Sequence, residues 1–151
     1  MPATSMEKYQ QTIEIRWADL DPNFHVLHSR YYDFGAYCRM MFFVEHGITP
    51  QVMLEQKFGP ILFREECIFK KELAFGDSVT INFFLTKLSP DLGRWSLKHE
   101  LWKNDDTLAA IIHVDGAWMD TVKRKLTLPP DGTQKLFDHA PRAESFEVVS
   151  K

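Results

Sequence analysis

One segment constrains the fold more than any other, because its apolar side chains recur at helical spacing and many of them are rings. The residues at three- and four-residue intervals are Tyr31, Phe34, Cys38, Met41 and Phe42. Other apolar residues fall off that stripe, namely Tyr32, Tyr37, Met40 and Phe43. With Ser29 as N-cap and Gly47 as stop, the pattern predicts a helix that is largely surrounded by protein. Gly35 inside it predicts a close approach by the backbone of another element.

The segments on either side of this helix alternate with the period of a strand. Ile13, Ile15 and Trp17 indicate a first strand that ends near Asp19. After a less regular stretch over 48–60, strand-like segments cover 61–73, 79–86, 94–102 and 108–119. Short turns between such segments predict an antiparallel meander. The order of elements predicts an α+β fold whose sheet curls around the long helix, with dimerisation through the sheet.

The length of the chain fits one domain. We expect a single domain over residues 1–151, with a core over about 11–130. The remaining residues, 131–151, are expected to form a tail. A short helix around Leu136, Phe137 and His139 is expected there, and Pro141 and the polar end predict fraying.

Charge and composition argue against several classes of partner. The net charge is −3, and the 18 Lys and Arg residues form no basic run, so no nucleic-acid partner is expected. Residues 1–11 lack the features of a signal peptide, and the apolar runs elsewhere are too short to span a bilayer. These features predict a cytoplasmic protein with no membrane partner. Cys38 and Cys67 are expected to be buried, reduced thiols.

A cluster of ionisable side chains lies immediately before the predicted helix. Asp19, Asp21, His25 and His28 fall within ten residues, in the stretch "ADLDPNFHVLH". Carboxylates and imidazoles beside an apolar segment are suited to acid–base chemistry. An Asp-x-Asp before proline is also typical of a turn in which carboxylates accept backbone N–H groups. The same four residues offer metal ligands, although no recognised zinc or iron spacing is present.

The stretches "RWADLDPNFHVLHSRYYDF" and "KKELAFGDSVTI" resemble the hotdog-fold acyl-CoA thioesterases of the 4-hydroxybenzoyl-CoA thioesterase type. The resemblance covers roughly Gln11 to Pro130. It implies a hotdog fold, an antiparallel sheet wrapped around a long central helix, and hydrolysis of an acyl-CoA to free acid and CoA. It also implies that no cofactor is needed and that the chain forms a homodimer or homotetramer.

The resemblance assigns two candidate catalytic residues. Asp21 matches the family's catalytic carboxylate, which acts as nucleophile or as general base. His28 matches a histidine that a subset of the family carries seven residues later, with Asp21 as its acidic partner. A backbone N–H near the helix start, that of His28 or a neighbour, would polarise the thioester carbonyl. Because thiolates leave readily without an acid, Asp21 ranks above His28.

Some residues depart from the family pattern. The family often has glycine where Phe24 stands and asparagine at one or both of Leu27 and His28, and some histidine-bearing members have tyrosine at the position of Trp17. Bulky side chains at Trp17 and Phe24 would narrow the pocket and favour short or medium acyl groups.

The other polar residues have simpler interpretations. We interpret Asp19 as a turn or strand-end residue and His25 as a packing or hydrogen-bonding residue. His99 and His113 are interpreted as face residues of the sheet, and Glu65 and Glu66 as solvated charges. Candidates for the CoA phosphates, none preferred, are Arg64, Lys70, Lys71 and Lys87. Two alternative functions stay open: a noncatalytic acyl-CoA binding module and a metal-dependent hydrolase.

Overall fold

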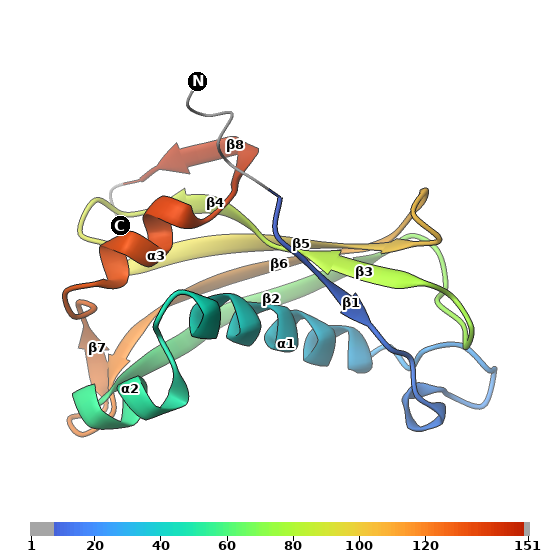
Figure 1. Cartoon of the computed structure of the whole chain (residues 1–151), viewed down its shortest axis with the longest axis horizontal. Helices are drawn as coiled ribbons and strands as arrows, with labels where there is room; N and C mark the ends of the chain where they lie inside the picture. The colour runs from blue at the N-terminus through green and yellow to red at the C-terminus, as the bar shows by residue number, and fades with distance from the viewer. Residues whose placement is uncertain (1–7, 150–151) are drawn as a thin grey trace.

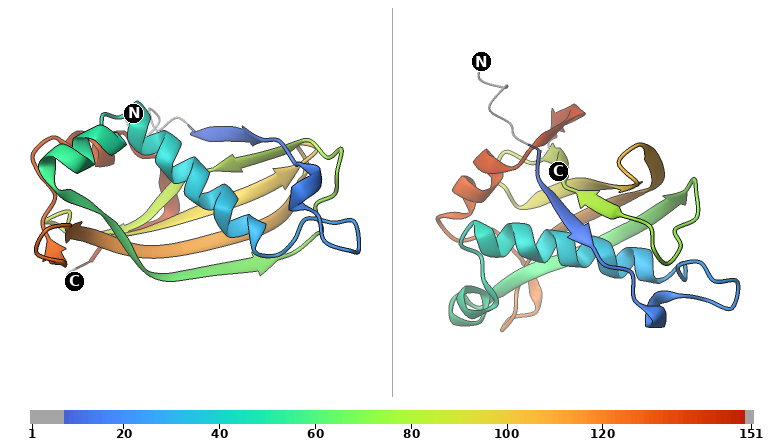
Figure 2. Two further views of the ribbon diagram at one scale, coloured as in Figure 1. Left: turned by 90° about the horizontal axis from the view of Figure 1, so that it is seen from below. Right: turned by 45° about the vertical axis from the view of Figure 1, so that its right-hand side comes forward.

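The computed structural model describes residues 8–149 as one sheet folded around one long helix (Figure 1). The helices are the 3-10 helix η2 (Trp17–Asp19), α1 (Arg30–Glu45), α2 (Pro50–Gln56) and α3 (Thr133–His139). The strands are β1 (Gln10–Ile13), β2 (Phe58–Phe69), β3 (Val79–Asn82), β4 (Phe84–Leu88), β5 (Arg94–Lys103), β6 (Thr107–Asp120), β7 (Lys125–Thr127) and β8 (Arg142–Val148). The views in Figure 2 show the sheet curving over α1. The predicted α+β architecture is confirmed.

The order of the strands differs from a simple meander. Strand β5 pairs with β3 and β4 on one side and with β6 on the other, all antiparallel. Strand β2 pairs antiparallel with β6, from Phe58 opposite Asp120 to Phe69 opposite Ala110. The predicted neighbour of β2 was the strand that follows it in sequence, so the meander prediction is wrong at this strand. The edge of β2 that faces away from β6 pairs with no strand among the described residues.

The central helix is buried on one side only. Tyr31, Phe34, Cys38 and Phe42 lie in the core, as their spacing predicts. Tyr37, Met40 and Val44 are exposed on the opposite face. The expectation that protein would surround the helix is therefore wrong, because the curved sheet covers only the face that points into it.

A polar network crosses the core beneath the middle of α1. Nη1 of Arg39 lies 3.2 Å from Nε2 of His99, and Nδ1 of His99 lies 2.7 Å from the carbonyl oxygen of Asn82. The guanidinium of Arg39 also lies 3.5 Å from the carboxylate of Glu65. A Cβ added to Gly35 would lie 3.3 Å from Arg39 and 3.3 Å from His99. Side chains, and not the predicted backbone, therefore make the close approach to this glycine.

Two segments that looked irregular in the sequence form regular elements. Helix α2 begins after Thr49, whose hydroxyl accepts the N–H of Val52 at 3.1 Å, with Pro50 in the first turn. In the segment expected to be a tail, the short helix predicted around Leu136, Phe137 and His139 is confirmed as α3, whereas the end that was expected to fray forms β8. Leu136 and Phe137 of α3 are buried in the core, and β8 pairs in parallel with β4. The prediction of fraying is wrong, because these apolar side chains cover the open end of the core.

Candidate active site

The loop between η2 and α1 has a defined hairpin-like shape. The backbone N–H of Leu27 donates to the carbonyl of Asp19 at 2.8 Å, and Leu20 forms a β-bridge with Val26. At the tip, the N–H of Asp21 donates to the carbonyl of His25 at 2.9 Å. A second bridge ties His25 to Ala74, in the segment that precedes β3. These bonds fix Asp21 close to the start of α1.

The carboxylate of Asp21 faces an imidazole, but it is the imidazole of His25. Oδ1 of Asp21 accepts the backbone N–H of Asn23 at 2.9 Å, as a turn aspartate does. Oδ2 lies 3.1 Å from Nδ1 of His25, and the Asp21 side chain is 14% exposed. Among the described residues, no hydrogen bond or ion pair joins Asp21 to His28. The hydrogen bond to Asn23 therefore confirms the predicted turn role of Asp21, while its catalytic role stays a prediction.

The position of Phe24 explains why glycine is expected there. Phe24 has a φ of +66°, in the left-handed region that favours glycine. Its N–H closes the turn by donating to the carbonyl of Asp21 at 2.9 Å. Phe24 and Trp17 are both exposed and neither lines the cavity beside Asp21, so the expected narrowing of the pocket by these rings is not seen.

The start of α1 offers free backbone donors beside this loop. Ser29 is the N-cap residue, as predicted, but its side chain makes no capping hydrogen bond. The N–H groups of Arg30 and Tyr31 donate to the carbonyls of Leu27 and His28. Within the described chain, the N–H groups of His28 and Ser29 have no hydrogen-bond acceptor. Such N–H groups, at the positive end of a helix dipole, suit a developing oxyanion.

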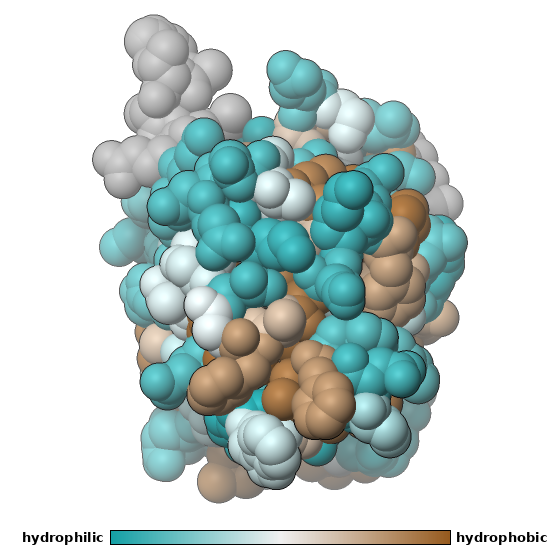
Figure 3. Space-filling view, turned by 90° about the vertical axis from the view of Figure 1, so that its right-hand side faces the viewer, coloured by the Kyte–Doolittle hydropathy of each residue, from teal (hydrophilic) through white to brown (hydrophobic). Residues whose placement is uncertain are grey.

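Asp21 and His28 line the same cavity, which has a volume of about 330 Å³. Its other lining residues are His25, Val26, Tyr31, Phe69, Lys70, Lys71 and Glu72. Burial raises the pKa of Tyr31 to about 12, so its phenol stays protonated at neutral pH. Figure 3 faces the end of the molecule that carries the loop and shows apolar side chains set among polar ones. The residues that line the cavity therefore include two carboxylates, two imidazoles, two lysines and apolar side chains.

Two of the four basic residues considered for CoA phosphates lie in this cavity. The backbone N–H groups of Lys70 and Lys71 both donate to the carbonyl of Ala109, at 2.8 and 3.0 Å. Neither ammonium group forms an ion pair within the described part of the chain. Arg64, in contrast, pairs with Glu66 and Asp115. Lys70 and Lys71 are therefore the available cations at the cavity.

The sequence of this chain matches a known protein family over most of its length. A family model described as the thioesterase-like superfamily matches residues 15–137. The chain belongs to the thioesterase-like superfamily. No curated protein matches it.

Solved structures resemble this thioesterase-like chain over most of its length. A hypothetical protein from Staphylococcus aureus in complex with CoA has a TM-score of 0.84 and 18% identity, covering 97% of this chain and 90% of that chain. A 1,4-dihydroxy-2-naphthoyl-CoA thioesterase from Synechocystis has a TM-score of 0.77 and 16% identity, with 87% and 96% covered. A gentisyl-coenzyme A thioesterase has a TM-score of 0.71 and 22% identity, with 85% and 99% covered. The hotdog fold is thereby confirmed.

Asp19 is not among the residues that line the cavity, unlike the other three acidic and imidazole residues of the loop. The carboxylate of Asp19 accepts hydrogen bonds from Arg16 at 2.8 to 3.2 Å and lies 3.3 Å from Nε of Arg30. The described residues contain no group of three or more His, Cys, Asp or Glu side chains able to hold a metal ion. This arrangement gives the metal-dependent alternative no support. In the same residues, no helix is long and apolar enough to cross a membrane.

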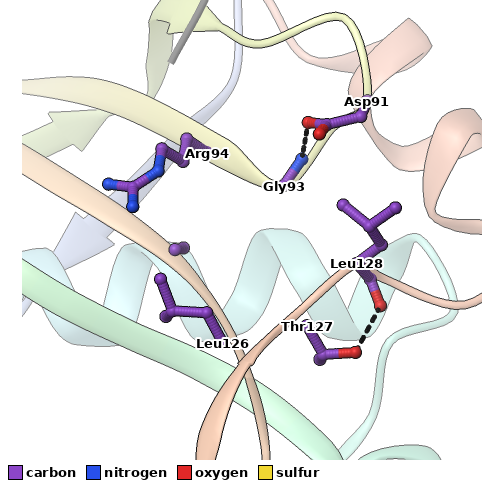
Figure 4. A pocket seen from close by; sticks show the side chains of 7 residues that line it. Asp91, Gly93, Arg94, Leu126, Thr127 and Leu128 are labelled. Carbon is purple, nitrogen blue, oxygen red and sulfur yellow. Dashed lines mark hydrogen bonds between the residues drawn. The ribbon is translucent and has the colours of Figure 1, made fainter.

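A second cavity lies at the opposite end of the sheet, between the turn after β4 and strand β7 (Figure 4). It has a volume of about 220 Å³ and is lined by Asp91, Gly93, Arg94, Ala117, Leu126, Thr127 and Leu128. The carboxylate of Asp91 accepts the N–H of Gly93 at 2.9 Å and the hydroxyl of Ser89 at 2.7 Å. The Thr127 hydroxyl donates to the carbonyl of Leu128. Because the Asp91 and Thr127 side chains are engaged in their own turns, the Asp21 cavity is the better candidate for an active site.

The sequence interpretation gave His25 a packing or hydrogen-bonding role but did not identify Asp21 as its partner. It lies four residues after Asp21 in a tight turn, and a turn of that length brings the side chains at its two ends together. The four-residue spacing alone therefore indicates contact between Asp21 and His25, whereas the family resemblance assigned His28 as the partner of Asp21.

Proposed function

We propose that the protein hydrolyses an acyl-CoA thioester and that the carboxylate of Asp21 attacks the carbonyl carbon or activates the water that does so. One observation carries the proposal: Asp21 lines a cavity beside backbone N–H groups that have no acceptor in the described chain. Membership in the thioesterase-like superfamily supports thioester hydrolysis as the general activity.

The carboxylate of Asp21 and the backbone N–H groups at the helix start would have separate roles in the reaction. In either route the C–S bond breaks, a hydroxyl group is added to the acyl carbon, and sulfur leaves as a thiol after taking a proton. As a nucleophile, Asp21 would form a mixed anhydride that water then cleaves; as a general base, it would take a proton from the attacking water. The N–H of His28 or Ser29 would stabilise the oxyanion.

The two histidines would have different tasks. His25 would hold the Asp21 carboxylate in place through Nδ1, since that nitrogen lies 3.1 Å from Oδ2. The side chain of His28 lines the cavity without contacting Asp21, so it would give a proton to the departing thiolate. An imidazole suits that transfer because its ring nitrogens can both accept and donate a proton.

The CoA part of the substrate fits the charges at the cavity. Lys70 and Lys71 would meet the phosphates. A structurally similar protein binds CoA, and two others are named as thioesterases of aromatic acyl-CoA substrates. These similar structures support an acyl-CoA substrate over an acyl-carrier-protein thioester. We also propose that the enzyme is of the 4-hydroxybenzoyl-CoA thioesterase type.

A homodimer is proposed to form along β2. This strand has one edge that pairs with no other described strand, and its exposed apolar residues include Leu62, Phe63, Ile68 and Phe69. A long unpaired edge is a template for a second copy. Sedimentation or light scattering at several concentrations tests this directly, and a monomer throughout would contradict it.

The test of the activity is release of free CoA from a panel of acyl-CoA thioesters, with and without chelator. We expect chelator-resistant turnover that falls at least about a hundredfold in Asp21→Asn, which is about 2.7 kcal/mol in the barrier. Asp33→Asn, at an exposed carboxylate on α1, is the control and should retain turnover. Binding of acyl-CoA without turnover would instead support the binding-module alternative, and loss with chelator would support the metal-dependent one.

A further inference from the structure

Asp19 makes more contacts than a turn residue requires. Its carboxylate is 1% exposed, and both oxygens have cationic partners. Oδ2 accepts the backbone N–H of Arg16 at 2.9 Å and its Nε at 3.2 Å, and Oδ1 accepts its Nη2 at 2.8 Å. Oδ1 also lies 3.3 Å from Nε of Arg30. The hydrogen bonds from Arg16 hold the pKa of this carboxyl below its usual range, so it remains a carboxylate.

These contacts join the two sides of the candidate active site. Asp19 precedes Asp21 by two residues, and its carbonyl closes the base of the loop by accepting the N–H of Leu27. Arg30 is the first residue of α1, directly after the N–H groups proposed to hold the oxyanion. The contact of Asp19 with Arg30 therefore connects the loop that carries Asp21 to the start of α1.

The placement of Arg30 is unfavourable for the helix itself. A cation in the first turn meets the positive end of the helix dipole, which destabilises an isolated helix by a few tenths of a kcal/mol or more. Two carboxylates offset that charge: Asp19, which is buried, and Asp33, which is exposed and lies 3.2 Å from Nη1. Only the contact with Asp19 reaches across to the loop.

We propose that Asp19 is a positioning residue for the proposed hydrolysis, acting through Arg30 to hold the start of α1 against the Asp21 loop. This inference rests on the proposed function. A displacement of the reacting groups by about 1 Å lowers turnover by as much as a hundredfold, with little effect on how the rest of the substrate binds. The expected signature is therefore a loss in kcat with little change in KM.

The experiment is a double-mutant cycle in steady-state CoA release, run well below the melting temperature of each variant. Asp19→Asn and Arg30→Met should each lower kcat at least tenfold and leave KM within threefold. The double variant should lose no more than about threefold beyond either single variant, because both remove the same link. Arg30→Lys keeps the charge and should recover most of the lost kcat. Asp33→Asn removes the other partner of Arg30 and should leave kcat unchanged.

Several outcomes would overturn the inference. Additive losses in the double variant would show that Asp19 and Arg30 act independently. Losses that follow the melting temperature across all variants would assign Asp19 a purely structural role. An equal loss of kcat in Asp33→Asn would show that the net charge at the helix start matters, and not the contact between Asp19 and Arg30. If the unmodified protein released no CoA from any thioester, the proposed function would fail first, and the positioning role with it.

Discussion

Nδ1 of His25 lies 3.1 Å from Oδ2 of Asp21, at the tip of the loop that leads into the central helix. The contact orients the proposed catalytic carboxylate and leaves Nε2 of His25 without a hydrogen-bond partner among the described residues. The residue that supports Asp21 is thus four positions away in sequence, although the family resemblance indicated the one seven positions away.

We predict that His25→Ala lowers kcat more than His28→Ala does. Loss of the His25 imidazole frees the Asp21 carboxylate to rotate, so kcat should fall about tenfold or more. His28→Ala keeps the backbone N–H proposed for the oxyanion and removes only a proton donor to a good leaving group, so its loss should be smaller. Steady-state assays of both variants provide the measurement. The reverse order would assign the supporting role to His28.

Replacement of the two cavity lysines should affect substrate binding and spare the chemical step. Lys70→Ala and Lys71→Ala are each expected to raise KM for an acyl-CoA severalfold with little change in kcat, because both ammonium groups line the cavity. The effect should shrink at high salt, which screens exposed charges. Lys125→Ala, on β7, serves as the control. An unchanged KM in both cavity variants would place the phosphates elsewhere.

The backbone at Phe24 predicts an unusual tolerance of glycine. A non-glycine residue with a φ of +66° costs about 1–2 kcal/mol, and the exposed ring recovers little of this by burial. Phe24→Gly should therefore leave the free energy of unfolding within about 1 kcal/mol, since relief of strain offsets the extra chain entropy of glycine. Phe24→Val removes the same ring but disfavours the left-handed region, so it should be clearly less stable. Urea titrations of the two variants decide the point, and equal stabilities would show that the turn has no strain.

Acid should destabilise the fold through His99. Burial, together with the neighbouring Arg39, lowers the pKa of His99 from 6.5 to about 3. Because the unfolded chain takes up this proton near pH 6.5 and the folded chain does not, stability from this group is fully present above pH 6.5 and is lost as the pH falls toward 3. The loss amounts to about 2 kcal/mol by pH 5.

The measurement compares unfolding free energies between pH 7.5 and 5. His99→Gln should be less stable overall, yet its stability should depend less on pH over this range. His139→Gln, at an exposed histidine on α3, should keep the slope of the unmodified protein. A slope that survives in His99→Gln would assign the acid sensitivity to other groups.

The sequence by itself determined the local elements. The three- and four-residue recurrence of Tyr31, Phe34, Cys38 and Phe42 identified α1, and alternation identified β5 and β6, because helices and strands repeat with fixed periods along the chain. The motif around Asp21 also placed a candidate carboxylate next to the helix start.

Tertiary structure decided everything that depends on contacts between distant segments. The pairing of β2 with β6, the burial of α3, and the placement of Lys70 and Lys71 beside Asp21 each join residues far apart in sequence. The contact of Asp21 with His25 and not with His28, and the contact of Asp19 with Arg30, depend on how this loop closes on itself and against Ala74. Periodicity reports which face a side chain occupies, but only packing determines which partner it meets there.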